Sequence, residues 1–412
     1  MNSTKEAALM MSSLSIYSGI RERSVIRAYY ELLCSIDKPV FEFARAWGEF
    51  FSLLCERECT EDFARYMTET ALFDENAFSR AAAAGKEKQM PSKTINAIRR
   101  DLSVIRRASL LSPDRILADY THRDELGTVA NNLPRWETGQ PVTEFLHEDE
   151  IIDTLSDFYK RNGCGMFARY RAFIWRNKRI EPVQFPDPIK ISSLKTYDLQ
   201  RGLVVDNTLA FLKGMQSNNC LLYGDRGTGK SSTVKAILNE YYKDGLRMVE
   251  MPKDRLSEFP LLAERIAQIP LKFIIFIDDL SFPTEDKSYA QLKAVLEGGL
   301  AVRPENALIY ATSNRRHIVK ESFAERQGDD IHFNDTVQET LSLSDRFGLA
   351  VGFTKPDKEQ YLEIVFSLAR DQKLNMSIEE LTAEAEKFAI SRGGRSPRCA
   401  IQCLNYLTAS RR

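Results

Sequence analysis

Eight consecutive residues carry the strongest chemical signal in the sequence. The segment GDRGTGKS, from Gly224 to Ser231, fits the pattern G-x-x-x-x-G-K-[ST] of a phosphate-binding loop, or P-loop. In such a loop, backbone N–H groups surround phosphate oxygens at the positive end of a helix. Lys230 is expected to reach the β- and γ-phosphates of ATP, and the Ser231 hydroxyl to ligate Mg²⁺. The residues predicted to bind the nucleotide in this region are Gly224, Asp225, Arg226, Gly227, Thr228, Gly229, Lys230, Ser231 and Ser232.

The apolar run at 273–277 is followed directly by two carboxylates, Asp278 and Asp279. Five consecutive apolar residues predict a strand that is buried on both faces, and ligands bind at the carboxyl ends of such strands. Asp278 is predicted to hold Mg²⁺, and Asp279 to orient or deprotonate the attacking water. The structural alternative is a strand that ends in an acidic turn, and the preceding P-loop makes this less favoured.

A third apolar run at 307–311 ends in Thr312, Ser313 and Asn314. Asn314 is a candidate to hydrogen-bond the γ-phosphate or the attacking water. An asparagine that forms a turn is the commoner structural interpretation of this position.

The elements that must position these side chains alternate in type. Strand-like runs at 220–223, 246–251, 273–277, 308–311 and 349–353 are separated by amphipathic stretches, which predicts a parallel α/β sheet. We therefore expect an α/β core at 206–354. After Pro356 only helical patterns remain, so residues 355–412 are expected to form a small helical domain.

In the first part of the chain the apolar residues are spaced differently. Apolar residues at helical spacing, such as Phe43, Trp47 and Phe50, predict a mainly helical domain at 1–180. Prolines at 182, 186 and 188 indicate a linker at 181–205. The basic and aromatic run at 169–179 is interpreted as a solvated helix, and binding of a single nucleic-acid strand is the alternative.

Composition limits the partners. The 412 residues include 57 Lys and Arg against 58 Asp and Glu, and this net charge of −1 provides no global field that attracts nucleic acid or anionic membrane. No run approaches the roughly 20 apolar residues that span a bilayer. An odd number of cysteines, 7, fits a reducing compartment better than a disulfide framework. We expect a cytoplasmic protein with no membrane partner.

Four segments together carry a family resemblance: NNCLLYGDRGTGKSS, FIIFIDDLSF, YATSNRRH and SLSDRFGL. They resemble AAA+ ATPases, and more narrowly the uncharacterised bacterial ATP-binding family catalogued as domain of unknown function 815. The resemblance runs from about Cys164 to Leu407. It implies an AAA+ P-loop core with a parallel five-stranded sheet, a helical C-terminal lid, ATP and Mg²⁺ as ligands, and assembly into a homo-oligomer.

The resemblance also implies individual roles. Asn314 matches the sensor-1 position, and Arg346 matches the arginine finger that reaches the γ-phosphate of a neighbouring subunit. Arg398 matches the sensor-2 arginine of the lid, although Arg395 competes for this role. The chain departs from the usual pattern at Asp279, where AAA+ proteins commonly place glutamate.

The resulting functional expectation is an ATPase that drives a conformational change in an unidentified protein partner. The alternative is a slow ATP-dependent switch or loader that acts on DNA or a protein assembly with little basal hydrolysis. Nucleic acid is the less favoured partner because the net charge offers no broad basic surface.

Overall fold

The computed structural model describes residues 2–280, 291–293, 295–296, 304–314 and 346–410. It divides the chain into two compact units, Met1–Arg169 and Tyr170–Arg412. No helix in these described ranges is both long and apolar enough to cross a bilayer.

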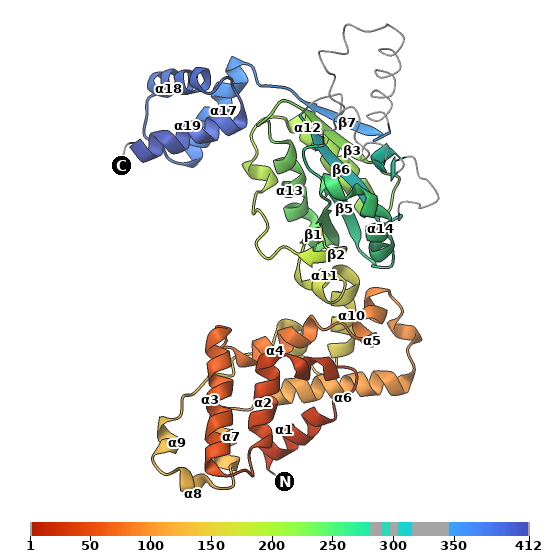
Figure 1. Ribbon diagram of the computed structural model, residues 1–412, viewed down its shortest axis with the longest axis vertical. Helices are drawn as coiled ribbons and strands as arrows, with labels where there is room; N and C mark the ends of the chain where they lie inside the picture. Colours follow the sequence, from red (N-terminus) through yellow and green to blue (C-terminus); the bar gives the residue numbers. More distant parts are fainter. Residues whose placement is uncertain (1, 281–290, 294, 297–303, 315–345, 411–412) are drawn as a thin grey trace. The chain divides into compact units, whose positions relative to one another are not determined.

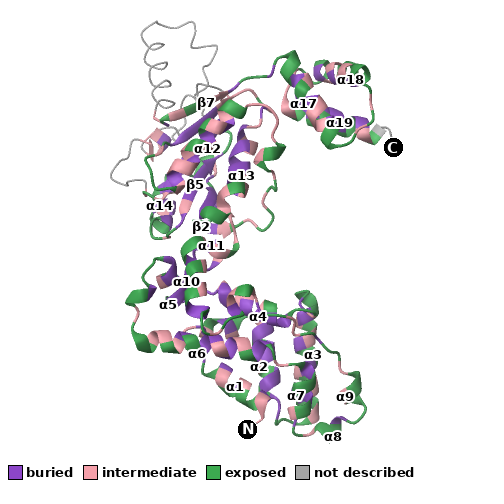
Figure 2. Cartoon of the chain, turned by 180° about the vertical axis from the view of Figure 1, so that it is seen from behind, coloured by how far each residue is buried: buried purple, intermediate pink, exposed green. Residues whose placement is uncertain are grey.

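The first unit is helical, as expected from its apolar periodicity, and its core is purple in Figure 2. The predicted stripe lies on α3 (Val40–Glu56), which buries Phe43, Trp47, Phe50 and Leu54. Aromatic side chains hold the core together, and the rings of Trp47 and Trp136 have centroids 4.9 Å apart. The remaining helices are α1 (Ser3–Ser12), α2 (Ser24–Cys34), α4 (Phe63–Leu72), α5 (Ala77–Ala83), α6 (Ser92–Ser109), α7 (Pro113–Asp119), α8 (Arg123–Leu126), α9 (Val129–Asn132), α10 (Ile151–Asn162) and α11 (Met166–Arg169).

The second unit contains a seven-stranded sheet in the order β2-β1-β4-β5-β6-β3-β7. All five predicted strands are present, as β3 (Cys220–Gly224), β4 (Leu246–Glu250), β5 (Lys272–Ile277), β6 (Ala307–Ser313) and β7 (Leu349–Phe353). They pair in parallel, so the expectation of a parallel sheet is confirmed. The expected number of five strands is wrong, because β1 (Ala172–Arg176) and β2 (Arg179–Pro182) extend the sheet beyond β4.

The two added strands correct the interpretation of residues 169–179 as a solvated helix. Phe173 and Trp175 are two residues apart and both are 1% exposed, which is the period of a strand. Asn177 and Lys178 have φ values of 52° and 57°, as the tight turn of a hairpin requires. Because the two aromatic side chains are buried, they offer no stacking platform to a nucleic-acid strand.

Helices cover both faces of the sheet (Figure 1). On one face, α12 (Asp198–Leu212) and α13 (Lys230–Tyr241) pack on alternate residues of the strands, with Val204, Val234 and Ile237 fully buried. Helix α14 (Phe259–Ala267) lies on the opposite side of the sheet. Helix α12 starts at Asp198, inside the segment that was expected to be a linker.

Three C-terminal helices follow β7: α17 (Lys358–Asp371), α18 (Ile378–Ser391) and α19 (Pro397–Ser410). They share a hydrophobic core that includes Tyr361, Ala385 and Leu404. Asp357 caps α17 by accepting the backbone N–H of Gln360 at 2.8 Å. The helical pattern predicted after Pro356 is therefore present.

Candidate functional site

The predicted P-loop connects the end of β3 to the start of α13, and its backbone requires glycine. Gly224, Gly227 and Gly229 have φ values of 129°, 78° and 94°, which other residues rarely adopt. A Cβ at Gly224 would also lie 2.2 Å from the carbonyl oxygen of Phe353. The loop consequently passes close to β7 and turns sharply into the first turn of α13, where N–H groups are unpaired within the helix.

Lys230 is the first residue of α13, and its ammonium group turns back toward the loop. Nζ donates hydrogen bonds to the carbonyls of Gly224 at 3.0 Å and Asp225 at 2.6 Å. It also donates to Oδ1 of Asn314 at 3.3 Å. Burial lowers the pKa of Lys230, while the carboxylates of Asp225, Asp279 and Asp278 act to raise it.

Asp278 and Ser231, the two predicted Mg²⁺ ligands, lie together. Ser231 Oγ donates to Oδ1 of Asp278 at 2.6 Å, although the two residues are 47 positions apart in the sequence. Thr312 Oγ1 donates to the same carboxylate oxygen and accepts the backbone N–H of Asp279 at 3.0 Å. Thr312 thus orients the acidic turn, a role that was not assigned from the sequence. In the sequence its signal is its place two residues before Asn314, at the end of the same apolar run.

Asp279 and Asn314 form the second pair at this edge of the sheet. The side-chain amide of Asn314 donates to Oδ1 of Asp279 at 2.6 Å. Asp279 has a φ of 51°, a left-handed conformation that aspartate tolerates better than most residues. The turn places its carboxylate beside the end of β6 rather than along β5.

The oxygen atoms present at this edge suit Mg²⁺. Magnesium in nucleotide sites is commonly bound by one or two protein oxygens, with phosphate oxygens and water completing the shell. The adjacent oxygens of Ser231 and Asp278 match that donor set. These two residues are therefore the candidates to hold the ion.

The C-terminal helices reach the P-loop through the start of α19. The backbone N–H of Arg398 donates to the carbonyl of Gly227 at 3.2 Å. Arg395 instead forms a two-point contact with Glu386, from Nε at 2.9 Å and Nη2 at 2.6 Å. The structure therefore brings Arg398, rather than Arg395, to the phosphate-binding loop.

Arg346 is half-buried and lies two residues before Gly348, close to the start of β7. The four preceding residues of the SLSDRFGL segment, 342–345, lie outside the described residues.

The remaining predicted residues of the P-loop differ in exposure. Arg226 is exposed, whereas Thr228 is 2% exposed and its hydroxyl donates to the Asp225 carbonyl at 2.8 Å. Ser232 is half-buried on the first turn of α13.

A mainly apolar pocket adjoins the P-loop and was not predicted from the sequence. It is lined by Tyr197, Thr228, Gly229, Phe353, Ile364 and Pro397, among others. Tyr197 has a φ of 61°, and its hydroxyl donates to the carbonyl of Thr354 at 2.6 Å. The residues that line this pocket come from segments far apart in the sequence, so no local pattern identifies them.

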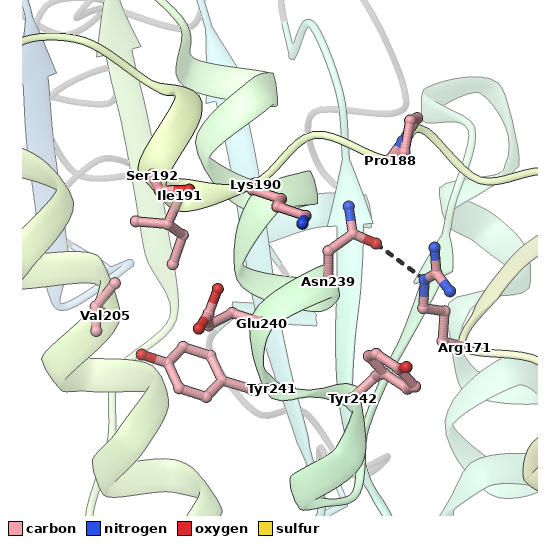
Figure 3. Close-up of a pocket in the computed structure, with 10 residues that line it drawn as sticks. All are labelled: Arg171, Pro188, Lys190, Ile191, Ser192, Val205, Asn239, Glu240, Tyr241 and Tyr242. Atoms are coloured by element: carbon pink, nitrogen blue, oxygen red, sulfur yellow. Dashed lines mark hydrogen bonds between the residues drawn. The ribbon is translucent and has the colours of Figure 1, made fainter.

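A second hollow, of about 780 Å³, lies at the other end of α13 (Figure 3). Its polar groups already hold the chain together: Arg171 Nε donates to Oδ1 of Asn239 at 2.9 Å, and the guanidinium stacks over Tyr242 at 5.1 Å. Asn239 Nδ2 donates to the carbonyls of Asp187 and Ile189. Arg171, part of the basic and aromatic run, is therefore used for packing.

Comparisons with known proteins agree with the resemblance seen in the sequence. The family model described as "Protein of unknown function (DUF815)" matches residues 168–411. No curated protein matches the chain. In the sheet, the P-loop strand β3 lies between β6 and β7.

Three solved structures are similar to part of the chain. A mutant of RuvB from Thermotoga maritima has 15% identity and a TM-score of 0.36, and the match covers 53% of this chain and 64% of that one. DnaA from Aquifex aeolicus, bound to AMPPCP, has 16% identity and a TM-score of 0.38, covering 55% and 67%. The RuvB Holliday junction branch migration motor of Thermotoga maritima has 13% identity and a TM-score of 0.32, covering 54% and 74%. The first RuvB match thus spans less than two thirds of that chain.

Proposed function

The chain belongs to the family described as Protein of unknown function (DUF815), and from the geometry of its P-loop site we propose that it binds and hydrolyses ATP with Mg²⁺. The observation that carries the proposal is the meeting of three groups at one edge of the sheet. These are the Lys230 ammonium, the Ser231–Asp278 oxygen pair and the Asp279–Asn314 pair. They are the cation, metal-binding oxygens and water-orienting acid that phosphoryl transfer to water requires.

In this reaction a water oxygen bonds to the γ-phosphorus, the bond to the β–γ bridging oxygen breaks, and ADP and phosphate leave. Lys230 stabilises negative charge on the phosphates, and Asp279 orients the water and accepts its proton. Asn314 holds the Asp279 carboxylate in place. Magnesium, held by Ser231 and Asp278, would supply positive charge to the phosphate oxygens. Backbone N–H groups of the P-loop, Gly224 to Ser232, would bind the phosphates.

We further propose that the active site is shared between subunits of a homo-oligomer. Arg346 would act as the arginine finger toward a neighbour's γ-phosphate, and Arg398 as the sensor-2 arginine of a lid formed by α17–α19. The contact of Arg398 with Gly227 supports the second assignment. Nucleotide-dependent lid movement would drive a conformational change in a protein partner. All seven cysteines are free thiols, which suits a cytoplasmic location.

The test combines two inactive variants. Lys230→Ala should weaken ATP binding and abolish turnover, and Arg346→Ala should bind ATP but turn it over slowly. Mixing them should restore part of the activity, because a mixed interface pairs an intact P-loop with an intact finger. Turnover by Lys230→Ala at the parent rate would contradict the proposal. Full activity of Arg346→Ala in a monomer would contradict the shared site alone.

A slow switch or loader is the second candidate, and the identity of residue 279 favours it. Asp279 is one methylene shorter than the usual glutamate, and a misplacement near 1 Å can lower a rate by roughly 10²-fold. Basal turnover would then be slow until a partner completes the site. Turnover measured with and without single-stranded and duplex DNA separates the candidates, because only a DNA-acting loader is stimulated.

A further inference from the structure

The chain that connects the sheet to the C-terminal helices is fixed at three consecutive residues. The carbonyl of Phe353 accepts the backbone N–H of Asp225 at 3.0 Å, and the carbonyl of Thr354 accepts the Tyr197 hydroxyl at 2.6 Å. The backbone N–H of Lys355 donates to Oδ2 of Asp225 at 2.9 Å. Asp225, a residue of the P-loop, therefore provides two of the three contacts.

The same residue is also bonded on its phosphate-binding side. Its carbonyl accepts the Lys230 ammonium at 2.6 Å and the Thr228 hydroxyl at 2.8 Å. A phosphate bound in the loop would compete for the Lys230 ammonium, because the ammonium donates to both. Any change in these bonds acts on the backbone of Asp225, whose side chain holds Lys355.

The connection between Lys355 and α17 is short. Pro356 has no backbone N–H, and Asp357 already caps α17. Only Pro356 and the capping residue Asp357 separate the bond at Lys355 from Lys358, the first residue of α17. Gly227 lies against the start of α19, where an added Cβ would be 3.1 Å from Oγ of Ser396, the residue before the helix. The P-loop thus contacts the C-terminal helical segment at two places, before α17 and at the start of α19.

We propose that Asp225 is a positioning residue that couples phosphate binding in the P-loop to movement of the C-terminal helices about Pro356. The proposal rests on the proposed nucleotide function and assigns to Asp225 a role that its place in the P-loop pattern does not imply. Coupling between two sites is reciprocal. If phosphate binding moves the C-terminal helices through Asp225, then loss of this connection also weakens nucleotide binding.

The experiment follows hydrogen–deuterium exchange of residues 358–410 in the full chain, with and without a non-hydrolysable ATP analogue and Mg²⁺. In Asp225→Ala the nucleotide-dependent protection should be lost, and the dissociation constant should rise by about tenfold, within the usual range of coupling. Asp225→Asn retains an acceptor oxygen for the Lys355 N–H and should keep the nucleotide-dependent protection that Asp225→Ala loses. Lys355→Pro removes the same hydrogen bond from the donor side and should reproduce the defect of Asp225→Ala.

The matched control is Asp357→Ala, which removes another aspartate that accepts a backbone N–H, two residues beyond Lys355. It should loosen α17 with and without nucleotide but preserve the nucleotide-dependent difference. Parent-like protection in both Asp225→Ala and Lys355→Pro would overturn the coupling. A defect in Asp225→Asn equal to that in Asp225→Ala would also overturn it, because the charge beside Lys230 would then be the cause. Failure of the parent chain itself to bind the analogue would instead reject the proposed function.

Discussion

The side-chain amide of Asn314 donates a hydrogen bond to the Asp279 carboxylate over 2.6 Å, across two adjacent strands. The oxygen of the same amide accepts the Lys230 ammonium at 3.3 Å. An ammonium can only donate and a carboxylate can only accept, so these partners fix the orientation of the amide. Asn314 therefore links the phosphate-binding cation to the acid that we propose for catalysis.

Replacement of Asn314 tests this link. Asn314→Ala should lower kcat by about 10- to 100-fold, because the Asp279 carboxylate loses the group that orients it. ATP affinity should change by less than about threefold, since Lys230 keeps its two carbonyl partners. Steady-state kinetics and a fluorescent-nucleotide titration measure the two effects separately. A change in affinity with kcat preserved would show that Asn314 acts on nucleotide binding instead.

Asp279 gives a sharper test because its backbone is unusual. Asp279→Asn should preserve ATP affinity and lower kcat, since only the charge that attracts the water proton is removed. Asp279→Glu tests the size of the acid, but at a φ of 51° glutamate carries more strain than aspartate. We expect Asp279→Glu to hydrolyse ATP more slowly than the parent, and its melting temperature to fall slightly. Faster hydrolysis would indicate a parent site that is slow by design, as a switch requires.

The site around Asp279 combines features that the sequence predicts with features that it does not. The P-loop, the five core strands and the placement of Asp278, Asp279 and Asn314 at one sheet edge followed from local pattern, because strand ends and glycine spacing are local properties. The left-handed turn at Asp279 and the contact of Thr312 with Asp278 depend on how β5 and β6 align. The alignment of two strands depends on contacts between residues far apart in the chain, and local sequence pattern does not predict those contacts.

The hairpin β1–β2 was missed for a different physical reason. Its cations at Arg176, Lys178 and Arg179 and its aromatic residues fitted a solvated helix, and a short alternating run is ambiguous between the two periods. The decisive contacts are tertiary: Trp175 Nε1 donates to Oε2 of Glu258 at 2.6 Å, and Arg265 stacks over the Trp175 ring. Packing on a segment about 80 residues later thus determined the conformation.

Thr312 provides a test of the metal-binding pair. Thr312→Val keeps the shape of the side chain but removes the hydroxyl that bonds Asp278 and the Asp279 backbone. The concentration of Mg²⁺ needed for half-maximal ATP turnover should rise by about 3- to 10-fold, because one hydrogen bond to a charged group is lost. Thr312→Ser keeps the hydroxyl and should remain close to the parent. Equal Mg²⁺ dependence in all three proteins would show that Thr312 does not position Asp278.

The last prediction concerns the glycines that shape the P-loop. Gly224 and Gly229 both have positive φ, yet only Gly224 faces a neighbouring backbone, since a Cβ there would lie 2.2 Å from the Phe353 carbonyl oxygen. Gly229→Ala should therefore lose only the strain of a left-handed alanine, about 1 kcal/mol of the free energy of unfolding. In Gly224→Ala the added methyl group also clashes with the Phe353 carbonyl, so β3 and β7 cannot keep their register. We expect this variant to lose about 3 kcal/mol of the free energy of unfolding. Calorimetry of the full chain measures this as a larger fall in the transition that contains the sheet, while the transition of the helical unit Met1–Arg169 serves as an internal reference. Equal stability of the two variants would mean that β3 and β7 can separate at Gly224 without loss, and that the close contact does not hold the loop in place.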